Sequence, residues 1–383
     1  MFTAKWEEIK EGKVSDVYFQ RACEIIRKKG IDKKVKVEVR VESMSYDWAV
    51  FCGLEEVLHL VKGLPVNLWA MEEGSIFHEG EPVIIIEGKY SDFGVLETAI
   101  LGFICQSSGI ATRASRCKKA AGNRTVFSFG ARRMHPAISP MIERSAFIGG
   151  CDGVSVIKSA EVIGERPVGT MPHALILLVG DETKAFKFFH EVMGKEILRI
   201  ALVDTMGDEK FTALRASEAL GENLYGVRLD TPASRRGDLK RIAEEVRWEL
   251  DLRGFRKVKI FVSGGIDEDE IIRLNEFVDG YGVGTTISSA QVIDFSLDIV
   301  EIEGVPVAKK GKKSGAKQVW RCSNCFSSRI LPWNISGGKC EKCNGKEFPL
   351  LKLMVEEGKL KYSLPSPQEI RKKVLKQLEN VSL

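Results

Sequence analysis

The sequence predicts an α/β protein whose largest part is an incomplete, about seven-stranded β/α barrel. Short apolar runs recur between residues 122 and 300, and helical segments separate most of them. Strands that alternate with helices form right-handed βαβ units and therefore a parallel sheet. No GxGxxG fingerprint follows the first run, which argues against a dinucleotide-binding fold. The apolar runs are TVFSF (125–129), GVSVI (153–157), a weaker VGTM (168–171), LRIALVD (198–204), LYGVRL (224–229), KVKIFVS (257–263) and VDGYGV (278–283).

Residues 1–121 form a predicted N-terminal α+β domain. KVKVEVRVE (34–42) alternates charged and apolar residues, which is typical of a half-buried antiparallel strand. GSIFHEGEPVIIIEGKY (74–90) has the turn–strand–turn rhythm of a small β-rich domain, and a helix over 94–121 is apolar enough to be largely buried. We expect another helix over 16–29. Its cap and apolar side are Asp16, Val17, Phe19 and Ile25.

Two further helices are predicted, one in the barrel domain (122–300) and one at the end of the chain. The barrel helix, 234–253, opens at Ser234 and repeats apolar residues at three- and four-residue steps: Leu239, Ile242, Val246 and Leu250. After residue 300 the periodicity is lost, and we expect an exposed connection into a small third domain, 301–383. It ends in an amphipathic helix capped by Ser366, with Pro367 in its first turn.

Four cysteines predict a metal site in the third domain. CSNC and CEKC are two CxxC pairs, separated by residues 326–339, and together they offer Cys322, Cys325, Cys340 and Cys343. Four thiolates at this spacing bind a tetrahedral metal, normally zinc, in a closed structural site. The lysines before the first pair suit a nucleic-acid contact or a solvated face, and we favour the solvated face. The other five cysteines are single and are expected to be reduced thiols.

Two glycine turns predict a phosphate site. FVSGGID (261–267) and YGVGTTIS (281–288) each run a strand into small residues and then a helix. Backbone N–H groups at a helix N-terminus bind phosphate without a lysine. In β/α barrels such a site is often built after the last two strands, where both turns lie. A single turn of this kind is equally well a tight βα connection, but two in succession favour a phosphate.

Other polar residues also follow predicted strands, where barrel enzymes place their active sites. FSFGARRMHP (127–136) offers an aromatic ring and two arginines, of which only one is expected to face the site if the segment is extended. VGTMPHAL (168–175) carries His173, and Asp204, Arg228 and Asp230 end later strands. Carboxylates beside a phosphate suggest Mg²⁺ binding by Asp204 and Asp230. Lys158 is a Schiff-base candidate for an alternative activity, a sugar-phosphate aldolase or isomerase.

The motifs together resemble archaeal nicotinate phosphoribosyltransferase along the whole chain. GKVSDVYFQRA, FGARRMHP, GTMPHAL, VDTMGDEK, VRLDTP, FVSGGID and YGVGTTIS occur in this order. The resemblance implies transfer of phosphoribosyl from phosphoribosyl pyrophosphate to nicotinate, giving nicotinate mononucleotide and pyrophosphate in NAD salvage. It also implies a homodimer, or a higher assembly of dimers, with shared active sites. Archaeal members also carry a C-terminal zinc-knuckle domain.

The same resemblance implies roles for individual residues. The pyridine ring stacks on Phe129 and, from the partner subunit, Tyr18, while Arg132 pairs with the carboxylate and Asp152 lies near base and ribose. Arg228 and Asp230 hold the ribose and pyrophosphate. The 5′-phosphate binds Gly264, Gly265, Gly282, Gly284 and Thr285. His173 matches a histidine that bacterial and animal relatives phosphorylate with ATP, so ATP is a candidate co-substrate.

The bulk properties agree with a cytoplasmic enzyme of small molecules. The net charge is only +4, the N-terminus has no signal peptide, and the short apolar runs do not suggest a membrane span. Alternatives within the same class are nicotinamide or quinolinate as acceptor. Quinolinate, with two carboxylates, calls for more cationic side chains than GARRMH supplies. A zinc-ribbon protein that binds nucleic acid is a third reading, which the modest charge disfavours.

Overall fold

The computed structural model describes residues 2–383 and divides them into two compact units. One unit comprises residues 2–112 and 291–382, and the other comprises residues 113–290 with Leu383. The predicted domains (1–121, 122–300 and 301–383) divide the chain differently. The C-terminal residues share a unit with the N-terminal ones because their strands pair, β1 with β12 and β3 with β17.

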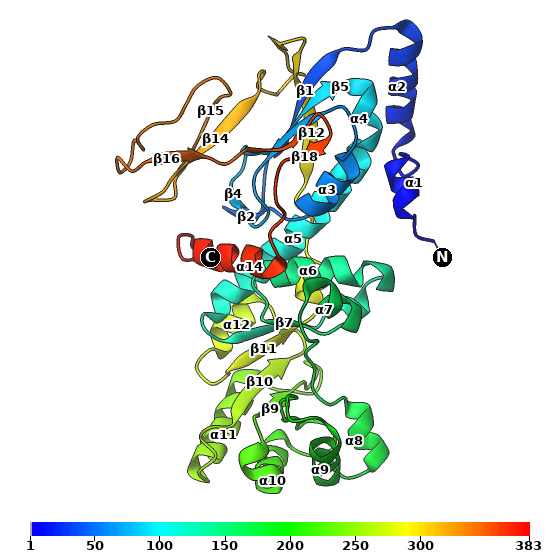
Figure 1. Ribbon diagram of the computed structural model, residues 1–383. Coiled ribbons are helices and arrows are strands. Elements are labelled where there is room, and N and C mark those ends of the chain that lie inside the picture. Colours follow the sequence, from blue (N-terminus) through cyan, green and yellow to red (C-terminus); the bar gives the residue numbers. More distant parts are fainter. Residues whose placement is uncertain (1) are drawn as a thin grey trace. The chain divides into compact units, whose positions relative to one another are not determined.

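The unit formed by residues 113–290 contains a six-stranded parallel sheet with the order β7-β6-β11-β10-β9-β8 (Figure 1). Every strand of this sheet is separated from the next in sequence by at least one helix, so the predicted fold class is confirmed. The strands are β6 (Thr125–Ser128), β7 (Gly153–Val154), β8 (Ile200–Leu202), β9 (Gly226–Leu229), β10 (Lys259–Ser263) and β11 (Gly280–Val283).

The sheet is a half-barrel because β7 and β8 form its two open ends. The weak seventh run, 168–171, is not a strand within the described residues. It is a loop whose Val168 N–H donates to the carbonyl of Val154, which extends the edge of the sheet by one hydrogen bond. The described residues between the two open edges, 155–199, form the helices α7, α8 and α9 and no strand of the sheet.

Helices connect the strands of this unit. Helix α11 begins at Leu239, where the side chain of Asp238 accepts the N–H of Lys240, so the predicted start at Ser234 is wrong by four to five residues. The helices are α6 (Ser139–Ile148), α7 (Ile157–Ile163), α8 (His173–Val179), α9 (Glu182–Val192), α10 (Glu209–Leu220), α11 (Leu239–Leu252), α12 (Glu268–Leu274) and α13 (Thr285–Ser288). Short 3₁₀ helices are η2 (Ala131–Arg133), η3 (Pro136–Ile138) and η4 (Gly221–Asn223).

The other unit is built on a seven-stranded sheet, a three-stranded sheet and a two-stranded sheet. Their orders are β13-β12-β1-β5-β3-β17-β18, β15-β14-β16 and β2-β4. The N-terminal strands are β1 (Lys34–Val41), β2 (Ala49–Val50), β3 (Asn67–Ala70), β4 (Ile76–Phe77) and β5 (Pro82–Lys89). The C-terminal strands are β12 (Phe295–Ile302), β13 (Val305–Pro306), β14 (Lys317–Cys322), β15 (Ser328–Pro332), β16 (Glu347–Pro349), β17 (Lys352–Glu356) and β18 (Lys359–Leu360).

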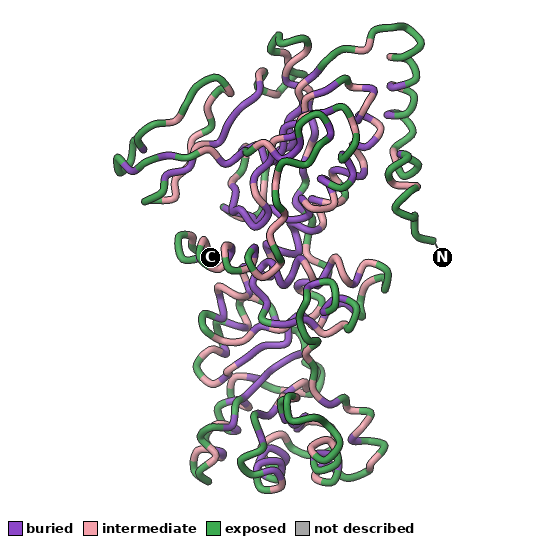
Figure 2. Tube along the Cα trace, in the orientation of Figure 1, coloured by how far each residue is buried: buried purple, intermediate pink, exposed green. Residues whose placement is uncertain are grey.

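Strand β1 is more deeply buried than its alternating sequence predicts, as the purple central strands of Figure 2 show. It pairs on both edges, with β12 and β5, and the charged residue Glu38 is only 1% exposed. The Glu38 carboxylate accepts from the backbone N–H and the ammonium group of Lys317, at 2.7 and 3.0 Å. A buried charge is tolerated when it is paired and hydrogen-bonded. The alternation therefore marks a paired charge and not a solvent face.

Seven helical segments complete this unit. Helix α2 has its predicted bounds, but its buried residues are Phe19 and Cys23, while Val17 and Ile25 are exposed, contrary to the prediction. The C-terminal helix α14 has the predicted Ser366 cap. The segments are α1 (Trp6–Lys10), α2 (Val17–Lys29), α3 (Leu54–Val61), α4 (Tyr90–Phe93), η1 (Gly94–Leu96), α5 (Glu97–Ala121, whose last residues belong to the barrel unit) and α14 (Pro367–Leu378).

One helical stretch, residues 90–121, is long and apolar enough to cross a membrane by length and composition alone. The sequence prediction overlooked this length because Gly, Ser and Thr interrupt its apolar run. Within the structure 56% of its most apolar window is buried, as in the core helix of a soluble protein.

Candidate active site

A cavity of about 620 Å³ lies at the carboxyl ends of the parallel strands. Its lining comes from the loops after β6, β7, β9, β10 and β11 and from the start of α8. These segments are far apart in the sequence and meet because parallel strands all end at one edge of the sheet. Ten of the predicted site residues line the cavity: Phe129, Arg132, His173, Arg228, Asp230, Gly264, Gly265, Gly282, Gly284 and Thr285.

The two glycine turns lie side by side in this cavity. Gly264 and Gly265 have φ angles of +85° and +70°, which favour glycine. The hydroxyl of Thr286 donates to the carbonyl of Ile266 at 2.8 Å and ties the second turn to the first. The first N–H groups of helix α13, which begins at Thr285, have no acceptor within the helix. The two turns therefore border the cavity with backbone groups suited to an anion.

Phe129 and two arginines form another part of the wall. A Cβ on Gly282 would come within 2.5 Å of the Phe129 ring, so the absence of a side chain at Gly282 leaves room for that ring. Arg132 and Arg133 both line the cavity. Residues 131–133 form a 3₁₀ turn and not an extended segment, so the alternation that would direct the two side chains to opposite sides does not apply. Which of the two meets a carboxylate stays a prediction.

A chain of polar contacts links His173, Asp230 and Arg228. His173 is the first residue of α8, and its Nδ1 lies 2.9 Å from the Thr205 hydroxyl. Its Nε2 lies 3.6 Å from Asp230 Oδ2, and an Arg228 Nη2 lies 3.9 Å from the same oxygen. The Ser263 hydroxyl donates to the other Asp230 oxygen at 2.7 Å. Burial lowers the pKa of Arg228, so the site holds a cation that a bound anion would stabilise.

Asp204 does not line the cavity but contacts the backbone that carries Asp230. Its Oδ2 accepts the backbone N–H of Asp230 at 2.7 Å and the Thr231 hydroxyl at 3.0 Å. Its Oδ1 is buried and has no hydrogen-bond partner within residues 2–383. Burial raises the pKa of Asp204. The side chain thus fixes the backbone that carries Asp230.

Two other predicted residues lie outside the cavity. Asp152 precedes β7, and its carboxylate accepts the Val126 N–H at the start of β6 and pairs with Lys118 at 2.8 Å. This contact lies toward the amino end of the parallel sheet, and Asp152 does not line the cavity. Its place near the base and ribose stays a prediction. Lys158 lies in α7, is 69% exposed and pairs with Glu161. An exposed, paired ammonium lacks the burial that activates a Schiff-base lysine.

Tyr18 and the four clustered cysteines belong to the other unit. Tyr18 lies on α2 and is 59% exposed. The Sγ atoms of Cys322, Cys325, Cys340 and Cys343 all lie within 4.8 Å of one another. Thiolates bound to a tetrahedral metal at about 2.3 Å are separated by similar distances. The cluster can therefore hold a metal ion.

Comparison with known proteins covers both units. Residues 16–108 match the quinolinate phosphoribosyl transferase N-terminal domain, and residues 110–298 match its C-terminal domain. The chain belongs to this family. Its fold has a TM-score of 0.98 to the crystal structure of nicotinate-nucleotide pyrophosphorylase from Pyrococcus furiosus, with 53% identity over all of this chain and 99% of that one.

Curated relatives in the family are named nicotinate phosphoribosyltransferases. The chain is 32% identical over 267 residues to pncB1 of Mycobacterium tuberculosis, covering 66% of this chain and 58% of that protein. It is 30% identical over 314 residues to the Bacillus subtilis protein, covering 72% and 63%. The chain thus spans about three fifths of the length of these relatives. Human nicotinic acid phosphoribosyltransferase shares the fold, with a TM-score of 0.79 at 19% identity over 96% of this chain and 94% of that one.

The structure of this phosphoribosyl transferase family member adds residues that the motifs did not reveal. Glu143 on α6 is fully buried, and its carboxylate accepts the N–H and hydroxyl of Ser155 and the N–H of Val156, at 3.1, 2.8 and 2.9 Å. Ser155 lines the cavity. The signal in the sequence is an acidic residue within the apolar helix SPMIERSAFI. Thr205 and Ser263 follow strands and position His173 and Asp230, but single hydroxyl residues carry little sequence signal.

Replacing Glu143 by glutamine is expected to lower the free energy of unfolding by about 1–3 kcal/mol, because one buried N–H or O–H donor then faces an amide NH₂ group. Chemical denaturation followed by circular dichroism measures the change. The matched control is Glu161→Gln, which removes an exposed ion pair with Lys158 and should cost less than about 1 kcal/mol. Equal effects of the two changes would contradict the role assigned to Glu143.

Proposed function

We propose that this protein is a nicotinate phosphoribosyltransferase, which transfers phosphoribosyl from phosphoribosyl pyrophosphate to nicotinate in NAD salvage. The main observation in support of this proposal is a single cavity that is lined by two glycine turns, three arginines, a histidine, a carboxylate and an aromatic ring. These are the groups that a phosphorylated sugar, a pyrophosphate and a flat carboxylated ring require. The names of the curated relatives support the same activity.

Nicotinate binds against Phe129 in this proposal. An aromatic face packs on the flat pyridine ring, and a guanidinium group binds a carboxylate through paired hydrogen bonds. Arg132 and Arg133 both line the cavity, so either guanidinium group can form these paired hydrogen bonds with the nicotinate carboxylate. The other arginine remains for phosphate oxygens. The sugar 5′-phosphate binds the backbone N–H groups of the two glycine turns, with Thr285 adding a hydroxyl.

Arg228 and Asp230 act on the two opposite charges that develop during the transfer. Glycosyl transfer passes through an oxocarbenium-like state, in which positive charge grows on the sugar and negative charge grows on the leaving group. Arg228 stabilises the leaving group, and Asp230, which lies on the same cavity wall, faces the positive charge of the sugar. The pyridine nitrogen attacks with its own lone pair, so the chain has to supply no strong base. His173 and Ser263 hold the Asp230 carboxylate in place.

The carboxylate of Asp230 fits the Mg²⁺ that accompanies phosphoribosyl pyrophosphate. Mg²⁺ is usually bound by one or two carboxylates together with substrate phosphates, whose charge it neutralises. Asp230 borders the cavity. Asp204 accepts the backbone N–H of Asp230 with one carboxylate oxygen, and its other oxygen is buried without a hydrogen-bond partner among the described residues. Asp204 therefore suits a supporting role better than direct binding.

Quinolinate is the second candidate acceptor, because the matched family carries that name. It has two carboxylates in place of one. The cationic side chains that line the cavity are Arg132, Arg133, Arg228 and, when protonated, His173. Arg228 is assigned to the pyrophosphate in this proposal, which leaves the pair of adjacent arginines for the base and the remaining phosphate oxygens. One carboxylate matches this pair better than two, since phosphate oxygens compete for the same groups.

We also propose a cytoplasmic homodimer in which Tyr18 of one copy stacks on the pyridine ring in the other. The exposure of Tyr18 and the exposed apolar residues Val14 and Val17 near it on the same segment support this proposal. ATP acts as a second substrate through His173, whose imidazole is 40% exposed beside the cavity. The cysteine cluster binds a structural Zn²⁺, because four sulfur ligands leave no position for a substrate.

Elemental analysis of the purified protein is expected to find about one zinc ion per chain. Cys340→Ser should lose the metal and lower the melting temperature, because metal binding stabilises the fold around it. Cys105→Ser, at a half-buried thiol outside the cluster, is the control and should keep the metal. Full metal content in Cys340→Ser would contradict the assignment.

The activity is tested by pyrophosphate release from phosphoribosyl pyrophosphate and Mg²⁺, with nicotinate, nicotinamide and quinolinate offered separately. We expect release with nicotinate, and much less with the neutral amide, because the arginines then face no negative charge. Release with quinolinate alone would show that the base assignment is wrong. No release with any base, from folded and metal-loaded protein, would refute the proposed function.

Substitution of His173 by alanine is expected to abolish any stimulation of the nicotinate reaction by ATP, because the phosphate acceptor is gone. Initial rates with and without ATP give the measurement. His59→Ala, at an exposed histidine on α3, should retain the stimulation. A His173→Ala protein that keeps the full ATP effect refutes the phosphohistidine route, whereas the proposed transfer reaction is tested separately by pyrophosphate release.

A further inference from the structure

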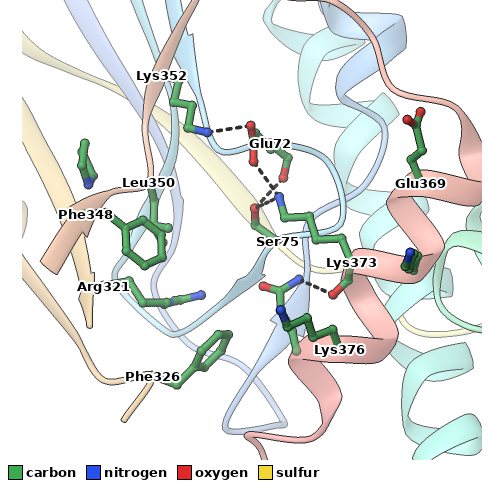
Figure 3. Close-up of a pocket in the computed structure, with 13 residues that line it drawn as sticks. Glu72, Ser75, Arg321, Phe326, Phe348, Leu350, Lys352, Glu369, Lys373 and Lys376 are labelled. Carbon is green, nitrogen blue, oxygen red and sulfur yellow. Dashed lines mark hydrogen bonds and ion pairs between the residues drawn. The ribbon is translucent and has the colours of Figure 1, made fainter. Parts of the chain in front are cut away.

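A second cavity, of about 420 Å³, lies in the unit formed by residues 2–112 and 291–382, between helix α14 and the three-stranded sheet β15-β14-β16 (Figure 3). Its volume is in the range of small-molecule sites. Helix α14 contributes a row of lysines, while β16 and the turn after Cys325 contribute two phenyl rings. None of the residues that line it belongs to the proposed catalytic cavity.

The lining is rich in cations. Five basic side chains face two acidic ones: Arg321, Lys352, Lys372, Lys373 and Lys376 against Glu72 and Glu369. Arg321 is 1% exposed, and its guanidinium pairs with Glu81, donates to the carbonyl of Ile76 and is structural. Counting Glu81 with the acids leaves five positive and three negative charges, a net of +2. A cavity with this balance attracts an anion.

Several ammonium donors of these lysines remain available. Glu72 accepts from Lys352 at 2.7 Å and from Lys373 at 3.0 Å, as the dashed lines of Figure 3 show. Lys373 also donates to the Ser75 hydroxyl at 3.0 Å, and each ammonium has three protons. Lys372 and Lys376 form no ion pair within residues 2–383. Burial lowers the pKa of Lys373, and the nearby cations Lys352 and Arg321 add to this, so an anion here would relieve repulsion.

The opposite wall offers apolar surface for a ring. Phe348 is 41% exposed, and Phe326 carries the Arg321 guanidinium 4.7 Å from its ring centroid. Both phenyl side chains project from the side of the three-stranded sheet in Figure 3, while Lys373 and Lys376 project from α14 and Lys352 projects from β17. Lysines alone would be an ordinary solvated helix face. Lysines that face the exposed ring of Phe348 across a cavity suit a ligand with an anionic end and a flat, apolar end.

We propose that this cavity binds a free nucleoside polyphosphate, with its phosphates on Lys372, Lys373 and Lys376 and its base against Phe348. The phenyl rings donate no hydrogen bond that would select one base, so the base preference is weak. A volume of about 420 Å³ suits a single nucleotide, and the three lysines line this one cavity instead of following a longer groove. A single-stranded RNA would need a groove that continues past the cavity. The site is independent of the catalytic proposal, because it uses none of its residues.

The test is isothermal titration calorimetry of the full-length, metal-loaded protein with four probes: ATP, adenosine, inorganic tripolyphosphate and a short oligoadenylate RNA. We expect ATP to bind more tightly than tripolyphosphate, and tripolyphosphate more tightly than adenosine. Lys372→Gln/Lys376→Gln should weaken ATP and tripolyphosphate about tenfold or more, since charge-assisted hydrogen bonds are lost. Phe348→Ala should weaken ATP and leave tripolyphosphate unchanged, because only the base contacts the ring.

The matched control is Lys29→Gln/Lys359→Gln, which removes the same charge from exposed positions in the same unit and should leave all affinities unchanged. ATP binding that survives the Lys372/Lys376 double change at full strength overturns the proposal, because the nucleotide is then bound elsewhere, for example beside His173. So does the absence of any ATP binding. If the oligoadenylate RNA binds more tightly than ATP and this binding is lost in the same variants, the ligand of the cavity is a nucleic-acid strand and not a free nucleotide. None of these results bears on pyrophosphate release.

Discussion

The parallel pairing of six strands is the constraint on which the candidate site depends. Because every strand ends at the same edge, residues as distant as Phe129 and Thr285 line one cavity. The open ends of the sheet, β7 and β8, leave room for the segment that carries His173. Buried side chains then hold the loops: Glu143 fixes the loop after β7, and Asp204 fixes the start of the loop after β9. The chemistry at the rim therefore depends on hydrogen bonds beneath it.

Much of the fold follows from sequence because strand and helix periods are local properties. The predictions failed where a long-range partner decides the outcome. The alternation of β1 indicates a solvent face, but Lys317, which lies 279 residues later in the chain, pairs with Glu38 and allows this charge to be buried. Likewise, Val17 and Ile25 have an apolar spacing, but only Phe19 and Cys23 find a surface to cover within the unit. The pairing of N-terminal with C-terminal strands, which merges two predicted domains, has no local signal.

The candidate site was predictable to the extent that it is made of strand-end motifs. Glycines and charged residues directly after apolar runs could be placed at the rim of the cavity, because parallel strands all end at the same edge of the sheet. Asp152 could not, because it precedes its strand, and a parallel sheet puts such a residue at the opposite edge. The local backbone also decides where the two adjacent arginines lie. A 3₁₀ turn directs Arg132 and Arg133 to the same cavity, whereas an extended segment would separate them. Backbone conformation at one tripeptide thus sets the number of cations that face the base.

That number bears on how one cavity can hold three anionic groups. A carboxylate, a sugar phosphate and a pyrophosphate together carry more negative charge than the three arginines and one histidine can balance. The glycine turns reduce the mismatch, because backbone N–H groups bind the sugar phosphate without using a side-chain cation. Arg228 is left for the pyrophosphate, one of the adjacent arginines Arg132 and Arg133 is left for the ring carboxylate, and the other is left for phosphate oxygens. A second ring carboxylate would have to take a cation from one of the phosphates. The small number of cationic side chains in the cavity, more than its size, therefore favours a base with a single negative charge.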